Sequence, residues 1–465
     1  MDTIIVCRNS QGTEVRATAL RVNRHAVVFE VYNPYSIVQL SEVLSDFRLM
    51  INEKIIYSGR AVVTNMVNTG TMLICEATLV EGWQDVDLFA LGREPGKLHA
   101  DFAEFLTEWE KIHRVIPDFK VIIADIQTLL MDLRSWFEQV EMGIRSQPSA
   151  DQRQNEANVI DALRPQMVPA VDDLFRRFES VAGAIGEDLQ PVHRAYVRRQ
   201  IHPLVLCSPF AYRTYHKPLG YAGDYEMVNM ILRDPLEGSS LFAKAVNMWF
   251  LNQAPAEAHR NRIDYLTYQL TAEIRRVAAE GRVARILNLG CGPAKEVQNL
   301  LTRLDLIGQA QFTLLDFNDE TFDYAKRVLL ELKQRHHRAT ELTFVKKSVH
   351  QMLKEGAAKQ NAAPAQYDII YCAGLFDYLS DRICKRLMET FYDALVPGGL
   401  LLVTNVDPSN PIRAMMEYFL EWHLIYRDAA QLRAICPDQA RPSTIQAHTD
   451  STGVNVFCQI RKSES

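Results

Sequence analysis

The segment Arg285-Ile-Leu-Asn-Leu-Gly-Cys-Gly-Pro-Ala294 joins a short apolar strand to a glycine loop, and the pattern predicts a helix from Lys295 to about Leu304. Gly290 and Gly292 can adopt backbone angles that are closed to other residues, so the main chain can approach a ligand closely. The following helix would point its N-terminal amides at the same ligand. The segment therefore predicts a nucleotide-cofactor loop, whose candidate contacts are Asn288, Gly290, Cys291 and Gly292.

A GxG turn alone is weak support for a cofactor, so the residues downstream of the loop decide. The apolar strand Gln311–Asp316 ends in a carboxylate, at the position where an open α/β sheet holds the hydroxyls of a ribose. Asp316 is therefore the predicted ribose ligand, and Phe317 and Asn318 beside it are further candidate cofactor contacts.

Two more strand ends belong to the predicted cofactor site. The strand Leu342–Lys346 leads to a serine and a valine that are suited to bracket an adenine ring by side chain and backbone amide. The strand Tyr367–Cys372 ends in an alanine-glycine turn. The candidate contacts after these two strands are Ser348, Val349, Cys372 and Gly374.

These residues require a sheet that brings the carboxyl ends of several strands to one edge. Strand and helix alternate from Arg285 through a helix at Asp381–Leu395 to a fifth strand at Gly399–Asn405, which implies right-handed crossovers and a parallel sheet covered on both faces. The segments Ser443–His448 and Val454–Ile460 predict a closing antiparallel hairpin. The expected fold class is α/β, with a Rossmann-like sheet of parallel strands plus this hairpin, preceded by a helical domain and a small N-terminal β-barrel.

This order of elements resembles the class I S-adenosylmethionine-dependent methyltransferases. The resemblance runs from about Arg282 to the C-terminus and rests on Leu287–Ala294, Leu314–Asn318, Tyr367–Gly374 and Leu395–Leu400. It implies S-adenosyl-L-methionine as the cofactor. Asn288 stands where the family usually has an acid, and Ala294 replaces a third glycine, so the methionine end of the cofactor is expected to be held differently. A sheet that has lost its cofactor is the alternative; a nicotinamide dehydrogenase is disfavoured because its glycines are spaced GxGxxG.

The segment Phe210–Glu226 precedes the sheet and is unusually rich in tyrosines, glycines and carboxylates. A lid over a cofactor needs rigid rings that exclude water and hydroxyls that orient the reactants. The stretch Lys217–Glu226, with Glu421–Arg427 after the fifth strand, resembles bacterial 3-hydroxypalmitic acid methyl ester synthases. A structural clasp between the helical domain and the sheet is the alternative interpretation.

The resemblance implies O-methylation of the carboxylate of a 3-hydroxy fatty acid, giving a diffusible methyl ester of the kind used in quorum sensing. A carboxylate acceptor is already ionised, so it needs a hydroxyl or cationic grip and no strong base. Asp224 and Glu226 fit partners of the cofactor's amino group or ribose, or a general base if the acceptor is a hydroxyl or amine. The candidate catalytic residues are His216, Tyr221, Asp224, His423 and Tyr426, with Tyr225 and Glu226 as cofactor contacts; Tyr215 and Arg427 are further possible donors.

Length, charge and cysteine spacing limit the class of protein to which this domain can belong. With 465 residues the chain should hold two or three domains, and a net charge of -6 with interspersed charges gives no footprint for nucleic acid. No secretory leader and no apolar run of about 18 residues is present, so a cytoplasmic protein is expected. The eight cysteines never approach CxxC spacing, which indicates buried small hydrophobes and neither a metal site nor a disulfide framework.

The first ninety residues predict a small antiparallel barrel, since short alternating segments are separated by turn residues. The expected strands are Thr3–Arg8, Glu14–Asn23, Ala26–Tyr32, Glu53–Asn65 and Thr71–Leu79. The region resembles a PilZ domain, a cyclic-di-GMP receptor whose ligand is held by an RxxxR pair and a (D/N)xSxxG turn. Here the turn would be Asn23–Val28, with His25 for the serine and Val28 for the glycine, and no RxxxR precedes it. The resemblance therefore implies a degenerate relative that does not bind the ligand.

From about Pro95 to Gln200 apolar residues recur every three or four positions, which indicates helices. One long stripe, or two helices broken near Pro117, runs from Phe102 to Phe137, and further helices are expected at Ala157–Leu163, Met167–Gly183 and Leu189–Ile201. The stripe is either the core of a bundle or a surface for self-association, which would make a homodimer.

The expected domains are a PilZ-like barrel over 1–92, a helical bundle or linker domain over 93–205, a lid over 206–280 and the catalytic domain over 281–465. The expected acceptor is a small molecule, a fatty acid or acyl derivative. Methylation of another metabolite or of a protein side chain is the rival reaction. A signalling adaptor, in which the barrel binds nucleotide or a partner and the sheet only senses the cofactor, is the rival class.

Overall fold

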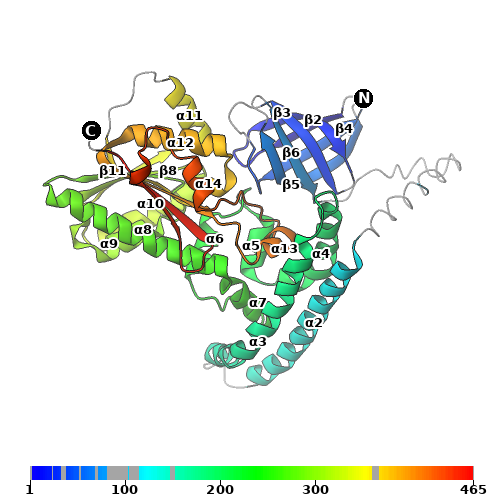
Figure 1. The fold of residues 1–465 in the computed structure, drawn as a ribbon. Helices are drawn as coiled ribbons and strands as arrows, with labels where there is room; N and C mark the ends of the chain where they lie inside the picture. Colours follow the sequence, from blue (N-terminus) through cyan, green and yellow to red (C-terminus); the bar gives the residue numbers. More distant parts are fainter. Residues whose placement is uncertain are drawn as a thin grey trace.

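A computed structural model describes residues 3–23, 25–32, 38–51, 54–68, 72–80, 103, 115–146, 152–358 and 366–463. It consists of an N-terminal barrel, a set of long helices and a mixed α/β body. The barrel stands beside the α/β body, and the long helices extend below both (Figure 1). Within the described residues no helix combines the length and the apolar character that crossing a membrane requires.

The barrel is closed and antiparallel, as the sequence predicts, with the strand order β1-β2-β3-β6-β5-β4. Its strands are β1 (Thr3–Arg8), β2 (Glu14–Val22), β3 (Ala26–Tyr32), β4 (Val43–Ile51), β5 (Lys54–Asn68) and β6 (Met72–Leu79). The sequence pattern misses β4. Its pairing with β5 shifts between Leu44 and Phe47, where Asp46 has a left-handed φ of 48°. This bulge interrupts the alternation of apolar and polar residues by which a strand is recognised.

The α/β body contains a sheet with the order β12-β13-β11-β10-β7-β8-β9. The strands are β7 (Ala284–Leu289), β8 (Ala310–Asp316), β9 (Glu341–Lys346), β10 (Tyr367–Cys372), β11 (Leu395–Val406), β12 (Ile445–Thr449) and β13 (Asn455–Arg461). The strands β9, β8, β7, β10 and β11 are parallel, whereas β13 pairs antiparallel with both β11 and β12. The predicted parallel order and the closing hairpin are both present. The strand β11 begins at Leu395, four residues before the predicted start of the fifth strand at Gly399.

Helices cover both faces of this sheet. They are α9 (Lys295–Arg303), α10 (Asp319–Arg335), α11 (Val349–Ala358), α12 (Asp381–Ala394) and α14 (Ala429–Ala434), with short 3-10 turns at Asp305–Gln309, Phe376–Tyr378 and Pro442–Thr444. The helix α13 (Arg413–Phe419) instead belongs to the core of the long helices. Alternate residues of one strand belong to different cores: Ile370 packs with α12, and Ile369 packs with α9 and α10. The central strands are therefore buried on both faces, as expected for a parallel sheet.

The long helices are α2 (Pro117–Arg145), α3 (Gln152–Gly183) and α4 (Gln190–Val205). The predicted break at Pro117 is the start of α2, where proline is tolerated because its missing amide would be unpaired. The sequence predicts two helices where α3 is one, because Pro165 and Pro169 lie inside it. The part of the apolar stripe before Val115 lies outside the described residues, apart from the single residue 103.

The described part of the stripe forms the core of the bundle. Phe119, Ile122, Ile126 and Phe137 are buried, although Trp136 keeps 45% of its surface exposed. Self-association through this helical region stays a prediction. The eight cysteines have no disulfide partners, and all are buried except the half-buried Cys207.

Four further helices connect the bundle to the sheet: α5 (Pro209–His216), α6 (Tyr225–Leu232), α7 (Leu241–Leu251) and α8 (Ala254–Ala279). One continuous hydrophobic core includes Phe178 of α3, Phe250 of α7, Ile263 of α8 and Phe419 of α13. The bundle and the lid region therefore share a core, which holds α8 firmly beside the carboxyl ends of the strands.

Candidate active site

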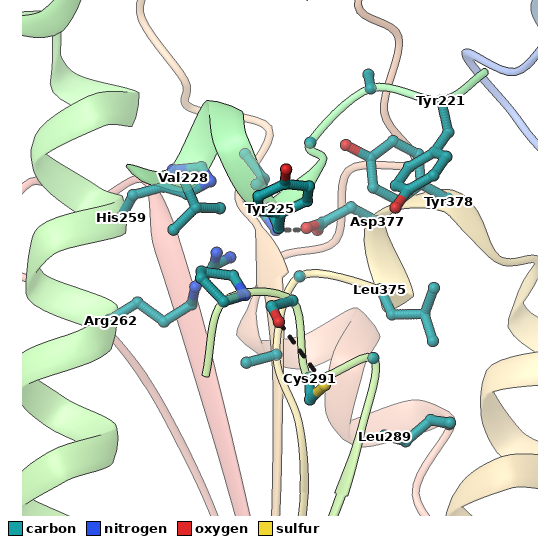
Figure 2. A pocket seen from close by; sticks show the side chains of 18 of the residues that line it. Tyr221, Tyr225, Val228, His259, Arg262, Leu289, Cys291, Leu375, Asp377 and Tyr378 are labelled. Carbon is teal, nitrogen blue, oxygen red and sulfur yellow. Dashed lines mark hydrogen bonds between the residues drawn. The ribbon is translucent and has the colours of Figure 1, made fainter. Parts of the chain in front are cut away.

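A cavity lies above the carboxyl ends of β7, β8 and β10. Its walls come from the glycine loop, from α8 and from the segment before α6, and two barrel residues contribute to them. Arg262 and His259 reach in from α8 on one side, and Tyr221 and Tyr378 lie on the opposite side (Figure 2). The residues predicted from sequence that line it are Tyr221, Tyr225, Asn288, Gly290, Cys291, Gly292, Asp316, Phe317, Val349 and Gly374.

The glycine loop has the backbone geometry that the sequence predicts. Gly290 and Gly292 have left-handed φ angles of 70° and 51°. The amides of Gly290 and Cys291 both donate to the carbonyl of Leu315 at 2.9 and 3.0 Å, which fixes the loop to β8. Ala294 replaces a third glycine but still has a left-handed φ of 49°, so the loop stores strain at the first residue before α9.

Asp316 sits at the end of β8 and is 5% exposed. Its Oδ2 accepts from the amide of Gly292 at 3.1 Å, and its Oδ1 accepts from the amide of Asn318 at 3.1 Å. Burial raises the pKa of this carboxyl, and the backbone hydrogen bonds oppose that rise. The Sγ of Cys291 also lies 4.0 Å from Oδ2, a weak contact that a ligand hydroxyl could replace.

Asn288 belongs to a buried polar group behind the loop. Its side-chain amide donates to Oε1 of Glu296 at 3.4 Å, and the hydroxyl of Tyr371 donates to the same oxygen at 2.7 Å. All three residues line the cavity and are buried. Glu296, the second residue of α9, therefore places a carboxyl group beside position 288, where the sequence lacks an acid.

Arg262 is a site residue that the sequence patterns missed. It is 7% exposed and lines the cavity, and a side chain at Gly374 would approach its Nη1 to 2.8 Å. No hydrogen bond or ion pair joins Arg262 to another described residue, although Asp377 and Glu296 interact with it electrostatically. A buried guanidinium without a direct partner is costly, so the site is suited to an anionic ligand group.

His259 lies one turn before Arg262 on α8. Its Nδ1 lies 2.8 Å from the carbonyl oxygen of Pro255, so Nδ1 carries the proton and Nε2 is a hydrogen-bond acceptor. Burial and the charge of Arg262 lower the pKa of His259 to about 3, which keeps the ring neutral. The residue can therefore accept a hydrogen bond from a ligand but is too weak a base to remove a proton at neutral pH.

A second, smaller cavity adjoins the first one and is lined almost wholly by apolar side chains. Pro255, His259, Met416 and Trp422 border both cavities. Other residues of the smaller cavity are Phe210, Ile231, Phe250, Met415 and Leu420. The two together form a polar chamber with an apolar extension.

Tyr221 and Tyr378 form the wall opposite α8. The Tyr221 ring packs on Phe317 with centroids 5.3 Å apart, and its hydroxyl lies 3.3 Å from Oγ1 of Thr321. The Tyr378 hydroxyl accepts from Nε1 of Trp422 at 2.9 Å, so its own proton is available for a ligand. Burial raises the pKa of both phenols, which therefore stay protonated.

Several predicted residues lie beside the cavity without lining it. Asp224 caps α6 by accepting from the amide of Met227 at 2.8 Å, and it forms an ion pair with Arg213 at 2.8 Å. Glu226 accepts from Asn229 and Arg233. Ser348 and Asn318 cap α11 and α10 respectively, and Cys372 is buried under the sheet edge. Direct contact of these side chains with the cofactor or the acceptor stays a prediction.

The remaining predicted donors lie farther away. His216 stacks between Tyr212 and Tyr215, outside the cavity. Tyr426 lies under Arg413 at 4.5 Å, and Arg427 is bound to the carbonyl oxygens of Phe376 and Leu379. His423 borders a different cavity, on the barrel side. The structure does not bring these side chains together with Tyr221.

The barrel contacts the site directly. Gln11 and Gln39 line the cavity. The Ser41 hydroxyl donates to the carbonyl of His423 at 2.9 Å and accepts from the amide of the same residue. Glu42 is buried and joins two barrel loops by accepting from Ser10 and from the amide of Gln39. The barrel is therefore part of the wall of the site.

The chain has similarity to known methyltransferases. Residues 287–401, which hold the glycine loop, Asp316 and Gly374, match a family model described as a methyltransferase domain. A search of curated proteins gives no match.

Solved structures with similar arrangements were also found. A possible exported protein from Bordetella parapertussis has 18% identity, covers 54% of this chain and 86% of its own, and has a TM-score of 0.42. The N-methyltransferase NodS from Bradyrhizobium japonicum, in complex with S-adenosyl-L-homocysteine, has 15% identity, coverages of 54% and 98%, and a TM-score of 0.30. Magnesium protoporphyrin IX methyltransferase from Synechocystis PCC 6803 has 10% identity, coverages of 58% and 99%, and a TM-score of 0.35. These identities and scores are too low to carry an argument about this chain.

The matched domain and the site above it define the enzyme class: the chain is a methyltransferase. Its cofactor is S-adenosyl-L-methionine. The cavity fits that cofactor, because a glycine loop, a strand-end carboxylate and a buried cation without a direct partner line one chamber.

Proposed function

We propose that this methyltransferase transfers the methyl group of S-adenosylmethionine to the carboxylate of a hydroxylated fatty acid. The observation that carries the proposal is the apolar extension of the polar chamber, bordered by Met416 and Trp422. The extension has a volume of about 30 Å³, so it takes in only part of an acyl chain as it stands, and each CH₂ group buried there would gain roughly 0.8 kcal/mol. The carboxyl end would then remain in the chamber.

Residues for the cofactor follow from the chemistry of its parts. Asp316 would hold the ribose, and Phe317 and Val349 would enclose the adenine. Arg262 would pair with the carboxylate of the methionine end, and Glu296 would take the amino group in place of the acid that position 288 lacks. The bound cofactor supplies a sulfonium methyl that is transferred in line to a nucleophile.

Residues for the acceptor lie around the apolar extension. The hydroxyl of Tyr378 would donate to one carboxylate oxygen, leaving the other oxygen to attack. His259, which accepts through Nε2, would receive the hydrogen bond of the acceptor's hydroxyl group. No base is required, since a carboxylate is ionised near neutral pH. The chain's contribution is alignment and exclusion of water.

For the remaining parts, we propose that the barrel is a PilZ-like module that no longer binds cyclic-di-GMP, and that the protein acts in the cytoplasm. A cavity walled by the glycine loop, α8, the segment before α6 and the barrel favours a small acceptor over a side chain of a folded protein. This supports the enzyme with a metabolite substrate against the protein-modifying alternative.

The test is incubation with labelled S-adenosylmethionine and saturated or 3-hydroxylated fatty acids of several chain lengths, followed by mass spectrometry. The expected result is a methyl ester, formed fastest with a 3-hydroxylated acid. A matched variant, Met416→Trp, would fill the boundary of the apolar extension and should shift the preference to shorter chains. Methylation of short polar acids at equal rates, with the same product profile in Met416→Trp, would contradict the acyl-chain proposal.

A further inference from the structure

A third cavity, lined by polar side chains and about 200 Å³ in volume, lies between the barrel, α4 and the extended segment Glu421–Ile425. We call it the barrel-side cavity. Thr64 and Glu76 line it from the barrel, Arg194 from α4, and His423 from the extended segment. It is separate from the methyl-transfer cavity, and neither the methyltransferase domain match nor the proposed reaction uses it.

Unsatisfied polar atoms gather around this cavity. Nε of Arg194 and Nε2 of His423 are buried and have no hydrogen-bond partner among the described residues. The two side chains are 4% and 3% exposed. The hydroxyl of Tyr418, over whose ring Arg194 lies at 5.6 Å, is also unpaired. Buried polar atoms without partners are few in folded proteins, so a cluster of them marks a place where a ligand or an ordered water belongs.

The charges around His423 favour an anion at the inner end of the cavity. Burial holds the pKa of His423 well below its ordinary value, and the charges of Arg194, Lys217 and Arg413 lower it further. Of the acids nearby, Glu417 is already paired with Arg413 at 2.9 Å, and Glu421 is paired with Arg198 at 3.1 Å.

Two more acids line the cavity without an ion pair in the described chain. Glu187 is exposed and Glu76 is half-buried. They would repel a second negative charge but can accept hydrogen bonds from hydroxyl or amino groups. The ligand that suits both ends therefore carries one compact anionic group and at least one hydrogen-bond donor.

We propose that the barrel-side cavity binds such a small anion, through a carboxylate or phosphate group held by Arg194 and His423, and that its occupancy regulates methyl transfer. An anion would form a charge-assisted hydrogen bond with the free Nε–H of Arg194.

The route to the active site is the extended segment itself. Its side chains alternate between the two cavities: Trp422 borders the methyl-transfer cavity, His423 borders the barrel-side cavity, and Leu424 borders both. Trp422 donates to the hydroxyl of Tyr378, the group proposed to hold the acceptor. A ligand that binds His423 and shifts it would therefore also shift its neighbour Trp422.

Binding is tested on the full-length protein by calorimetry and thermal unfolding, with sodium phosphate or sodium lactate as probes and sodium chloride of equal ionic strength as the control. The proposal expects saturable binding of at least one probe, and the arm that binds identifies the anionic group. Arg194→Gln should weaken binding about tenfold or more, since it removes a charge-assisted bond. Arg199→Gln, which removes the same charge from an exposed position on α4, should not.

A gain-of-binding variant guards against misfolding of Arg194→Gln. Glu76→Gln removes a negative charge from the cavity wall and should tighten the binding of both anions. The effect should be larger for phosphate than for lactate, because phosphate carries more negative charge. Absence of saturable binding, or equal weakening by Arg194→Gln and Arg199→Gln, would overturn the site. Binding that leaves the methyl-transfer rate unchanged would overturn the regulatory role, whereas a coupled site should change the rate by about fivefold or more.

Discussion

The backbone amide of Val43 donates a hydrogen bond of 2.7 Å to the carbonyl oxygen of Gly220. This contact joins the barrel to the loop that carries Tyr221. Gly220 has a left-handed φ of 85°, and a side chain there would come within 3.0 Å of Cβ of Ser10. Only glycine allows the loop and the barrel to approach so closely. The barrel is therefore a component of the active site, and a chain without it should lose an organised wall.

Asp316→Ala should remove most of the affinity for S-adenosylmethionine. Two ribose hydroxyls bound to one carboxylate are charge-assisted, and their loss should cost ~2 to 3 kcal/mol, or about 30- to 150-fold in Kd. Titration calorimetry measures it. Asp319→Ala, an exposed acid three residues on, is the control. Unchanged affinity in Asp316→Ala would place the ribose contact elsewhere.

Arg262→Met should weaken binding of the methionine end of the cofactor without weakening binding of its adenosine part. If the guanidinium holds the methionine carboxylate, affinity for S-adenosylhomocysteine should fall by about tenfold or more, while affinity for adenosine stays constant. Arg275→Met, an exposed arginine on the same helix, should change neither value. Equal losses for both ligands in Arg262→Met would indicate general damage to the cavity and count against the assigned contact.

Tyr221→Phe and Asp224→Asn should behave differently. Tyr221 lines the cavity, so loss of its hydroxyl should slow methyl transfer about tenfold with little effect on folding. Asp224 lies outside and pairs with Arg213, so its variant should lower stability by ~1 to 3 kcal/mol through the lost charge. Rates and unfolding curves separate the two. A wild-type rate in Tyr221→Phe would leave the segment as a structural clasp only.

Glu42 should make the stability of the barrel depend on pH. Burial raises its pKa from 4.5 to about 7. Because the folded state favours the protonated carboxyl, this contribution to stability is complete below pH 4.5 and is lost as the pH rises through about 7. The loss should be on the order of 3 kcal/mol. Glu42→Gln should not show this loss. The free energy of unfolding of the wild type minus that of Glu42→Gln should therefore change over this pH range. Parallel curves of the two free energies against pH would disprove the assignment.

Cyclic-di-GMP should not bind the full-length chain at micromolar concentration. In the barrel, Val28 is a strand residue paired with Glu76 and Arg21, where a binding turn would need the freedom of glycine. Asn23 instead caps its own turn by accepting from the amides of His25 and Ala26. Calorimetry would decide, and tight binding would restore the signalling adaptor as the better description.

Much of the sheet was predictable because its signals are local. Asp316 and the glycine loop follow apolar strands at fixed spacing, so short windows of sequence find them. Arg262 and His259 gave no such signal, since they lie on an ordinary amphipathic helix whose position against Gly374 depends on packing over more than a hundred residues. Their spacing of three on one helix face was the only available hint.

Residue types alone do not distinguish a side chain that caps a helix from one that binds a ligand. Asp224 and Ser348 are polar residues beside the site, yet both are bound to helix N-termini. The sequence around each is compatible with a cap or a ligand contact, and only the fold distinguishes them. Similarly, His423 is close to Trp422 in sequence but faces the other cavity, because an extended chain alternates its side chains.

The pairing of Ser41 with His423 has a consequence for biosynthesis. The two residues are 382 positions apart. On a ribosome the barrel, which has its own core, emerges before the segment that it must dock on, and that segment follows 382 positions later. Until then, the barrel loops that later close the cavity face solvent. A nascent chain therefore stays catalytically incomplete until the extended segment has been made, and truncation before that segment should yield a protein that retains the barrel yet never closes its active site.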